Sequence, residues 1–349
     1  MRRASAAALL AACVLARVAD LPRVEGGRGG RLEDVDDDGD GTSFGWRRHH
    51  PRSHPELLGR PCTLDRADAS SLTPAAFATR YQRPNRPVVL TGLASRNAEF
   101  RAMCHRDALL ERWGDAAIVL STANTHSYDK HVKTLREYAE HHMTPQTLDA
   151  RGDETLYWFG DNDHGEWAPH FERYRAPPHV PATADVALSF GVGGPLSGVP
   201  LHVHGPGFSE TIVGRKHWWL APHAPKPRFD PNATALEWAL GWIEAEAARA
   251  AEAGREEAGA SNDEDPKKRR DDIAKTPRAD DAPAFFECTV GEGEAVYFPD
   301  GWWHATLNLD ESVFMSSFVN YARDERARDG DATLELDDLK LELDDLFEL

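Results

Sequence analysis

One pair of short segments constrains the fold of this chain more than any other feature. Residues 291–304 read GEGEAVYFPDGWWH, a Gly-rich turn, a short apolar run and a Pro-Asp-Gly turn that ends at His304. Earlier in the chain, His202 and His204 stand two positions apart, the spacing of side chains on one face of a strand. A barrel of short strands can bring the three imidazoles together, so the pattern favours a mainly β fold with flanking helices (α+β).

The three histidines are candidate metal ligands. The neutral imidazole nitrogen binds iron, zinc, copper and nickel. A His-x-His pair also occurs as a packed or surface pair, so the spacing alone leaves metal binding open. Other catalytic motifs are incomplete: residues 191–194, GVGG, are not followed by the third glycine of a dinucleotide-binding loop, and the sequence has neither Gly-x-Ser-x-Gly nor a phosphate-binding loop.

Charge and composition limit the partners. The 349 residues carry 58 acidic and 40 basic side chains, and the resulting net charge of −18 argues against nucleic acid as a partner. No run approaches the roughly 18–20 apolar residues that a membrane-spanning helix needs, so we expect no membrane span. Eight of the ten tryptophans lie between residues 158 and 303, where we expect the main core.

The N-terminal segment has the composition of a targeting sequence. Arg2 and Arg3 precede an apolar stretch over 4–16, which predicts a secretory signal peptide over 1–19; an organelle transit peptide is the alternative. Residues 20–58 are rich in Gly, Asp, Arg and His, and we expect a disordered leader there.

The main domain is expected over 59–323. Its first part mixes helices, predicted from a cap at Ser71–Thr73 to Tyr81 and over 100–113, with strands over 87–90 and 117–120. Strands dominate after residue 155. Residues 244–283 are charged, Ala-rich and nearly free of large apolar side chains, which predicts a fraying helix and then a low-complexity insertion.

The C-terminal tail, 324–349, is acidic and rich in leucine. Leu336, Leu339, Leu343 and Leu346 form one apolar stripe on a helix that is too short to persist alone. We expect it to dock on its own domain or on a partner, which could be a second copy of the chain.

Cysteine usage leaves two alternatives open. Once the signal peptide is removed, Cys62, Cys104 and Cys288 remain, and they could form one disulfide with one free thiol or stay as three buried thiols. Asn232-Ala-Thr234 is a glycosylation sequon, usable only in the secretory pathway.

Two longer segments resemble a known family. Residues 202–216, HVHGPGFSETIVGRK, and residues 297–308, YFPDGWWHATLN, are similar to the JmjC domain, a cupin-type double-stranded β-helix or jelly roll. The resemblance extends to residues 121–124 and 156–162 and covers roughly 62–319, apart from the insertion. It implies a jelly roll that uses Fe(II), 2-oxoglutarate and O₂ to hydroxylate or demethylate.

The resemblance also implies roles for particular residues. His202 and His304 match the two metal-binding histidines, and Lys216 matches the lysine that binds the far carboxylate of 2-oxoglutarate. Tyr157 and Ser316 fall where such enzymes often place hydroxyl donors to the same cofactor.

The chain departs from the family pattern at one ligand. His204 stands where the family has Asp or Glu, and three neutral imidazoles leave the full double charge of the ion uncompensated. We therefore expect zinc to compete better with iron and binding to depend more on pH, because each histidine must lose its proton. Whether Glu210 supplies the missing carboxylate stays open.

Two functions remain as expectations. The first is a 2-oxoglutarate-dependent hydroxylase of a protein substrate, and Lys216, Tyr157 and Ser316 favour it. The second is a non-catalytic scaffold that binds protein partners, which His204 favours; a structural zinc site is a further alternative. The resemblance and the predicted signal peptide indicate the lumen of the endoplasmic reticulum in either case.

Overall fold

The computed structural model of the protein describes residues 41–49, 54–125, 129–160, 162, 165–258 and 285–321. The predicted signal peptide, most of the predicted leader and insertion, and the acidic tail lie outside these residues. All the described residues belong to one unit, which begins at Gly41.

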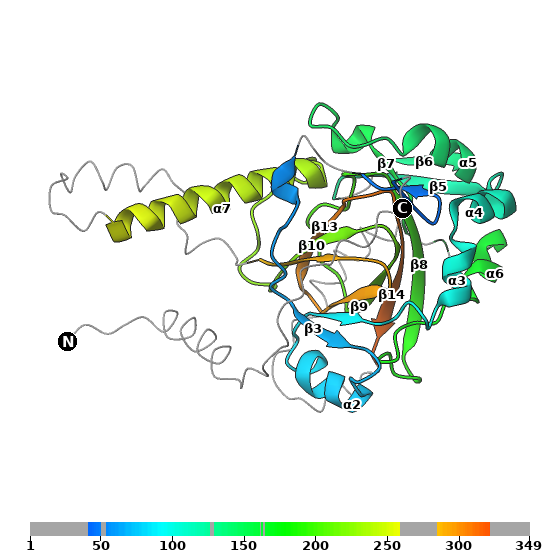
Figure 1. Cartoon of the computed structure of the whole chain (residues 1–349), viewed down its shortest axis with the longest axis horizontal. Helices are drawn as coiled ribbons and strands as arrows, with labels where there is room; N and C mark the ends of the chain where they lie inside the picture. The colour runs from blue at the N-terminus through cyan, green and yellow to red at the C-terminus, as the bar shows by residue number, and fades with distance from the viewer. Residues whose placement is uncertain are drawn as a thin grey trace. The chain divides into compact units, whose positions relative to one another are not determined.

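Two facing sheets form the body of that unit (Figure 1). The larger sheet has the strand order β3-β4-β12-β9-β14-β8, antiparallel throughout except between β3 and β4. Its strands are β3 (Asp65–Asp68), β4 (Val88–Thr91), β8 (Asp185–Gly193), β9 (Gly207–Val213), β12 (Glu294–Phe298) and β14 (Ser312–Asn320).

The smaller sheet has the order β11-β10-β13. Its strands are β10 (Lys216–Ala221), β11 (Phe286–Val290) and β13 (Trp303–Asn308). Residues 196–202 run antiparallel beside β13, with backbone hydrogen bonds that end in a reciprocal pair between His202 and His304. Strands thus alternate between two antiparallel sheets, as in a jelly roll, and the expected double-stranded β-helix is confirmed.

Helices and two small sheets surround this body. The helices are α2 (Pro74–Phe77), α3 (Ala98–Met103), α4 (Arg106–Trp113), α5 (Leu135–Glu137), α6 (Ala168–Phe171) and α7 (Ala235–Ala258), with single 3₁₀ or π turns at Pro55–Leu57, Ala78–Gln82, Tyr138–His142, Gly152–Glu154 and Gly165–Trp167. The small sheets are β1 (Thr42–Ser43) with β2 (Trp46–Arg47), and β5 (Ala117–Thr122) between β6 (Lys130–Thr134) and β7 (Leu156–Tyr157).

Aromatic side chains fill the layers between sheets and helices. Phe100 of α3 and Trp113 of α4 belong to the same buried cluster as Phe190 of β8. On the smaller sheet, Trp219 packs edge-on against Trp238 of α7, with ring centroids 5.4 Å apart. The sheets are therefore held from outside, which leaves their inner faces to line a pocket.

The helix predicted over 100–113 is two helices. α3 ends at Met103, and α4 begins at Arg106 after His105, whose backbone is extended (ψ 133°). The break is stabilised by Trp46, whose indole N–H donates to the carbonyl of Cys104 at 2.8 Å. By contrast, Thr73 caps α2 as predicted, accepting a hydrogen bond from the N–H of Ala76.

Residues 41–49, within the segment predicted to be a disordered leader, are folded. They contain the β1–β2 pair, and Trp46, the first residue of β2, is 1% exposed. The guanidinium of Arg47 pairs with Glu311, and the backbone N–H of His49 donates to Asp310 at 2.9 Å. Charge and a single tryptophan anchor this segment, although its composition is that of a loop.

Cys62 and Cys288 form a disulfide between the segment before β3 and strand β11, while Cys104 is a buried free thiol. The first of the two cysteine alternatives is therefore correct. Among the described residues, no helix combines the length and the apolar composition that a bilayer crossing requires.

Candidate metal centre

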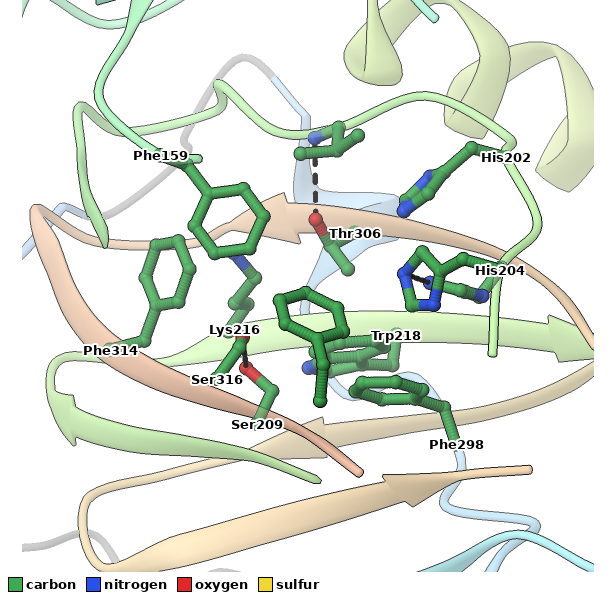
Figure 2. A pocket seen from close by; sticks show the side chains of 13 residues that line it. Phe159, His202, His204, Ser209, Lys216, Trp218, Phe298, Thr306, Phe314 and Ser316 are labelled. Atoms are coloured by element: carbon green, nitrogen blue, oxygen red, sulfur yellow. Dashed lines mark hydrogen bonds between the residues drawn. The ribbon is translucent and has the colours of Figure 1, made fainter. Parts of the chain in front are cut away.

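The fold brings the three predicted histidines to one point. His202 and His304 exchange backbone hydrogen bonds of 3.0 and 2.9 Å, and His204 lies on the same face two residues later. The Nε2 atoms of His204 and His304 are 3.1 Å apart, and one ring nitrogen from each of the three histidines lies within 4.8 Å of the others. Figure 2 shows the rings of His202 and His204 at the same end of the pocket.

Backbone carbonyls fix the protonation of all three rings. The Nδ1 atoms of His202, His204 and His304 lie 2.7, 2.8 and 2.9 Å from the carbonyl oxygens of Pro200, Gly205 and Trp302. A carbonyl oxygen only accepts, so each Nδ1 carries the proton and donates it. Each neutral ring therefore presents the lone pair of Nε2 to the common point, as a metal-binding histidine must.

Burial keeps these imidazoles neutral. Removal from water lowers the pKa of His202 to about 3 and of His204 to about 4, and it lowers the pKa of His304 well below its usual value. The expected loss of metal binding through histidine protonation is consequently shifted to acidic pH.

The geometry and the donor set fit a divalent transition metal. Nitrogen ligands lie about 2.0–2.1 Å from such an ion, so two of them at a right angle are roughly 3 Å apart. The 3.1 Å between His204 and His304 agrees with this. In the described part of the chain, the cluster of candidate ligands contains these histidines and no carboxylate.

Lys216 lines the other end of the pocket, and the predicted site residue Tyr157 contacts it without lining the pocket itself. The Lys216 ammonium donates to the hydroxyl of Tyr157 at 2.8 Å and lies 3.6 Å from the ring centroid of Phe314. Lys216 is 2% exposed, and burial lowers its pKa well below the usual value. No described carboxylate pairs with it, so an anion bound here would satisfy a charge that is otherwise costly to bury.

Cross-strand register fixes the distance between the two ends. On β10 and β13, Lys216 is opposite Asn308, and Trp218 is opposite Thr306. His304 lies two pairs further, opposite Leu220, so about 13 Å of strand separates the lysine and histidine backbones. Both side chains line the same pocket between these two strands and the larger sheet.

Hydroxyl and aromatic groups form the walls (Figure 2). Ser316 Oγ hydrogen-bonds Ser209 Oγ at 3.0 Å beside Lys216. Apart from the histidines, Lys216 and the hydroxyl of Thr306, the rest of the wall is aromatic or aliphatic. The lining residues that the sequence did not single out are Phe159, Val199, Ser209, Trp218, Phe298, Thr306, Phe314 and Phe318.

Strand alternation could have found several of these residues. Ser316 implies Phe314 and Phe318 on the same face of β14, and Lys216 implies Trp218 on β10. Phe159 stands two positions after Tyr157, so the same rule points to it, although β7 itself ends at Tyr157.

Glu210 does not join the centre. It follows Ser209 on β9, and successive strand side chains point to opposite faces. Its Oε2 accepts hydrogen bonds from Asn97 and Tyr174, at 2.9 and 3.0 Å. Burial raises the pKa of Glu210 to about 7. Its side chain lies on the side of α3 and α6, so Glu210 does not supply the carboxylate ligand that the sequence left open.

Comparisons with known proteins agree with this architecture. The family described as "Cupin-like domain" matches residues 74–322. JmjC domain-containing protein 8 of Rattus norvegicus is 41% identical over 276 residues, covering 79% of this chain and 89% of the relative. The Homo sapiens protein of the same name is 42% identical over 282 residues, covering 81% of this chain and 91% of the relative. The bifunctional arginine demethylase and lysyl-hydroxylase psr-1 of Caenorhabditis briggsae is 25% identical over 295 residues, covering 74% of this chain and 62% of the relative.

Proposed function

Because the chain belongs to the cupin-like family of JmjC domain proteins, we propose that it is a 2-oxoglutarate-dependent oxygenase that hydroxylates a protein side chain. One observation carries the proposal: three neutral Nε2 donors face one point in the same pocket that buries an ammonium group without a carboxylate. A metal would complete the first end and a carboxylate the second.

In this proposal, one end of the pocket binds the metal and the other binds a carboxylate. His202, His204 and His304 would hold the ion, and Lys216 with the hydroxyl of Tyr157 would hold the far carboxylate of 2-oxoglutarate. When bound, iron and 2-oxoglutarate supply the O₂-dependent oxidation of a C–H bond. Ser316 and Ser209 place hydroxyl groups in the pocket wall, where they can hydrogen-bond the cofactor. The phenylalanine rings in the same wall would exclude water from the bound cofactor.

We also propose that the protein works in the secretory pathway, in the lumen of the endoplasmic reticulum. The disulfide between Cys62 and Cys288 supports an oxidising compartment, where such bonds persist. The basic and apolar N-terminal segment is consistent with secretion. In that compartment a protein substrate is more plausible than nucleic acid, given the net charge of −18.

A non-catalytic role is the second candidate. The position where the family pattern has a carboxylate is His204, and Glu210 points away from the centre. A three-histidine site suits zinc as well as iron, and zinc would hold the barrel together without redox chemistry. In this alternative the jelly roll is a scaffold for protein partners.

The binding of 2-oxoglutarate to the full chain separates these candidates. We would load the protein with Mn(II) under anaerobic conditions and titrate 2-oxoglutarate by calorimetry. The oxygenase proposal expects saturable binding that requires the metal and is lost in Lys216→Met. Lys226→Met, which removes a lysine that lies over Trp303 outside the pocket, is the matched control and should bind normally.

Two results would overturn the oxygenase proposal. One is the absence of binding at millimolar 2-oxoglutarate, and the other is equal affinity in the wild type and in Lys216→Met. Either result favours the scaffold. Lys216→Met also removes an unpaired buried charge, so we expect it to fold at least as stably as the wild type.

A further inference from the structure

Asn232, the first residue of the glycosylation sequon, has an exposed side chain. It lies in the turn before α7, where Ala233 N–H donates to the Asp230 carbonyl at 3.1 Å and Asn232 N–H donates to the Asp230 carboxylate at 2.9 Å. These bonds fix the backbone and leave the side-chain amide of Asn232 without a hydrogen bond to any described residue. Asn232-Ala-Thr234 is the one Asn-x-Ser/Thr sequence in the 349 residues.

The hydroxyl of Thr234 has a structural task in the folded protein. Its Oγ1 accepts a hydrogen bond from the N–H of Glu237 at 3.1 Å, which caps the first turn of α7. Thr234 is 2% exposed, whereas Asn232 is exposed. The hydroxyl that completes the acceptor sequence is therefore out of reach once α7 has formed.

We propose that Asn232 carries an N-linked glycan, attached before the N-terminus of α7 is capped. The inference rests on the proposed entry into the secretory pathway. A lipid diphosphate-linked oligosaccharide is the donor: the Asn232 amide nitrogen bonds to the anomeric carbon, the bond from that carbon to the phosphate oxygen breaks, the lipid diphosphate leaves, and the amide loses one proton.

The position of the glycan has a consequence for the proposed site. Pro231, next to Asn232, accepts a backbone hydrogen bond from Thr125, and the Thr125 hydroxyl donates to the carbonyl of Leu201, next to His202. The glycan thus stands beside the segment that carries a candidate metal ligand. It keeps this flank hydrated and prevents it from being buried against another folded protein.

Expression of the full chain in secretory cells tests the proposal. We expect a single increase in mobility on treatment with an N-glycosidase, absent from Asn232→Gln. Two substitutions at Thr234 separate the sequon from the cap. Thr234→Ser keeps both and should be glycosylated, whereas Thr234→Asn keeps a good capping residue and should not be. A shift that persists in Asn232→Gln would overturn the assignment.

A reporter distinguishes failure of this site from failure of secretion. Gly259→Asn makes a second sequon with Ala260 and Ser261. If that variant is glycosylated once and the wild type is not, the chain enters the lumen but Asn232 is not modified, and only the present inference fails. If neither is glycosylated, both the inference and the proposed lumenal location fail.

The order of events has its own test. Purified oligosaccharide transferase and its lipid-linked donor should modify the Asn232 amide in unfolded, unglycosylated chain, and should leave the folded chain unmodified. Equal modification of both forms would contradict attachment before capping.

Discussion

The Nε2 atom of His204 lies 3.1 Å from that of His304, although a backbone carbonyl already holds the Nδ1 proton of each ring. Two neutral rings in this state turn lone pairs towards each other, which is unfavourable unless a cation or an extra proton stands between them. Burial opposes the extra proton. The arrangement of the two Nε2 atoms therefore favours a bound cation between them.

His204→Asp should increase the affinity for Mn(II) or Fe(II) by at least tenfold and reduce the preference for Zn(II). A carboxylate offsets one unit of the ion's charge and suits the harder ions. In the absence of metal, the same change buries an unpaired carboxylate, so we expect the melting temperature to fall and to recover when metal is added. Competitive metal titration measures both effects, and unchanged affinities would remove His204 from the coordination sphere.

Metal affinity should be nearly flat between pH 6 and 8. The pKa values of His202 and His204 in the folded protein are about 3 and about 4, so protons compete with metal only in acid. The stability of the metal-free protein behaves differently: because the folded-state values are lowered from 6.5, the unfolded chain binds more protons below that pH, and stability falls as the pH drops below 6.5. A tenfold loss of affinity per pH unit between 7 and 6 would disagree with buried neutral rings.

Glu210→Gln should change the pH dependence of stability and leave metal binding unchanged. The folded-state pKa of Glu210 is raised from 4.5 to about 7, so its contribution is fully present below pH 4.5 and is lost as the pH rises through 7. Glutamine stays neutral, and the variant should be more stable than the wild type at pH 8 by up to about 3 kcal/mol. Urea unfolding at pH 5 and pH 8 measures the difference. A lower metal affinity in this variant would contradict the position of Glu210 on the outer face.

Cys288→Ala should destabilise the folded protein by about 2–5 kcal/mol, because the bond to Cys62 closes a long loop in the unfolded chain. Cys104→Ala is the comparison. It removes a buried thiol that is not in a disulfide and should cost less. Under native conditions, thiol reagents should fail to label Cys104. Equal stability of Cys288→Ala and the wild type in oxidising buffer would contradict the pairing.

Much of the pocket follows from strand alternation and could be predicted. His202 and His204 share a face, Lys216 opens β10, and Ser316 faces inward on β14. The same rule, applied to Ser209, would also have excluded Glu210 from the metal centre. These positions are readable because a two-residue period fixes the facing of a strand once a single residue is placed.

Contacts between distant segments were not predictable in the same way. The break in the helix after Met103 depends on Trp46, and the order in residues 41–49 depends on Glu311 and Asp310 at the far end of the chain. The outer network around Glu210 also requires Asn97 and Tyr174 from two other segments. Local composition does not encode such pairings, since they arise only when the sheets have assembled.

Calorimetric titration of the full chain with Mn(II) under anaerobic conditions tests the three-histidine centre most directly. We expect one ion per chain, with binding lost in His304→Ala and retained in His131→Ala, which removes an exposed histidine on β6. Equal binding of Mn(II) by the wild type and by His304→Ala would contradict a metal centre at this point.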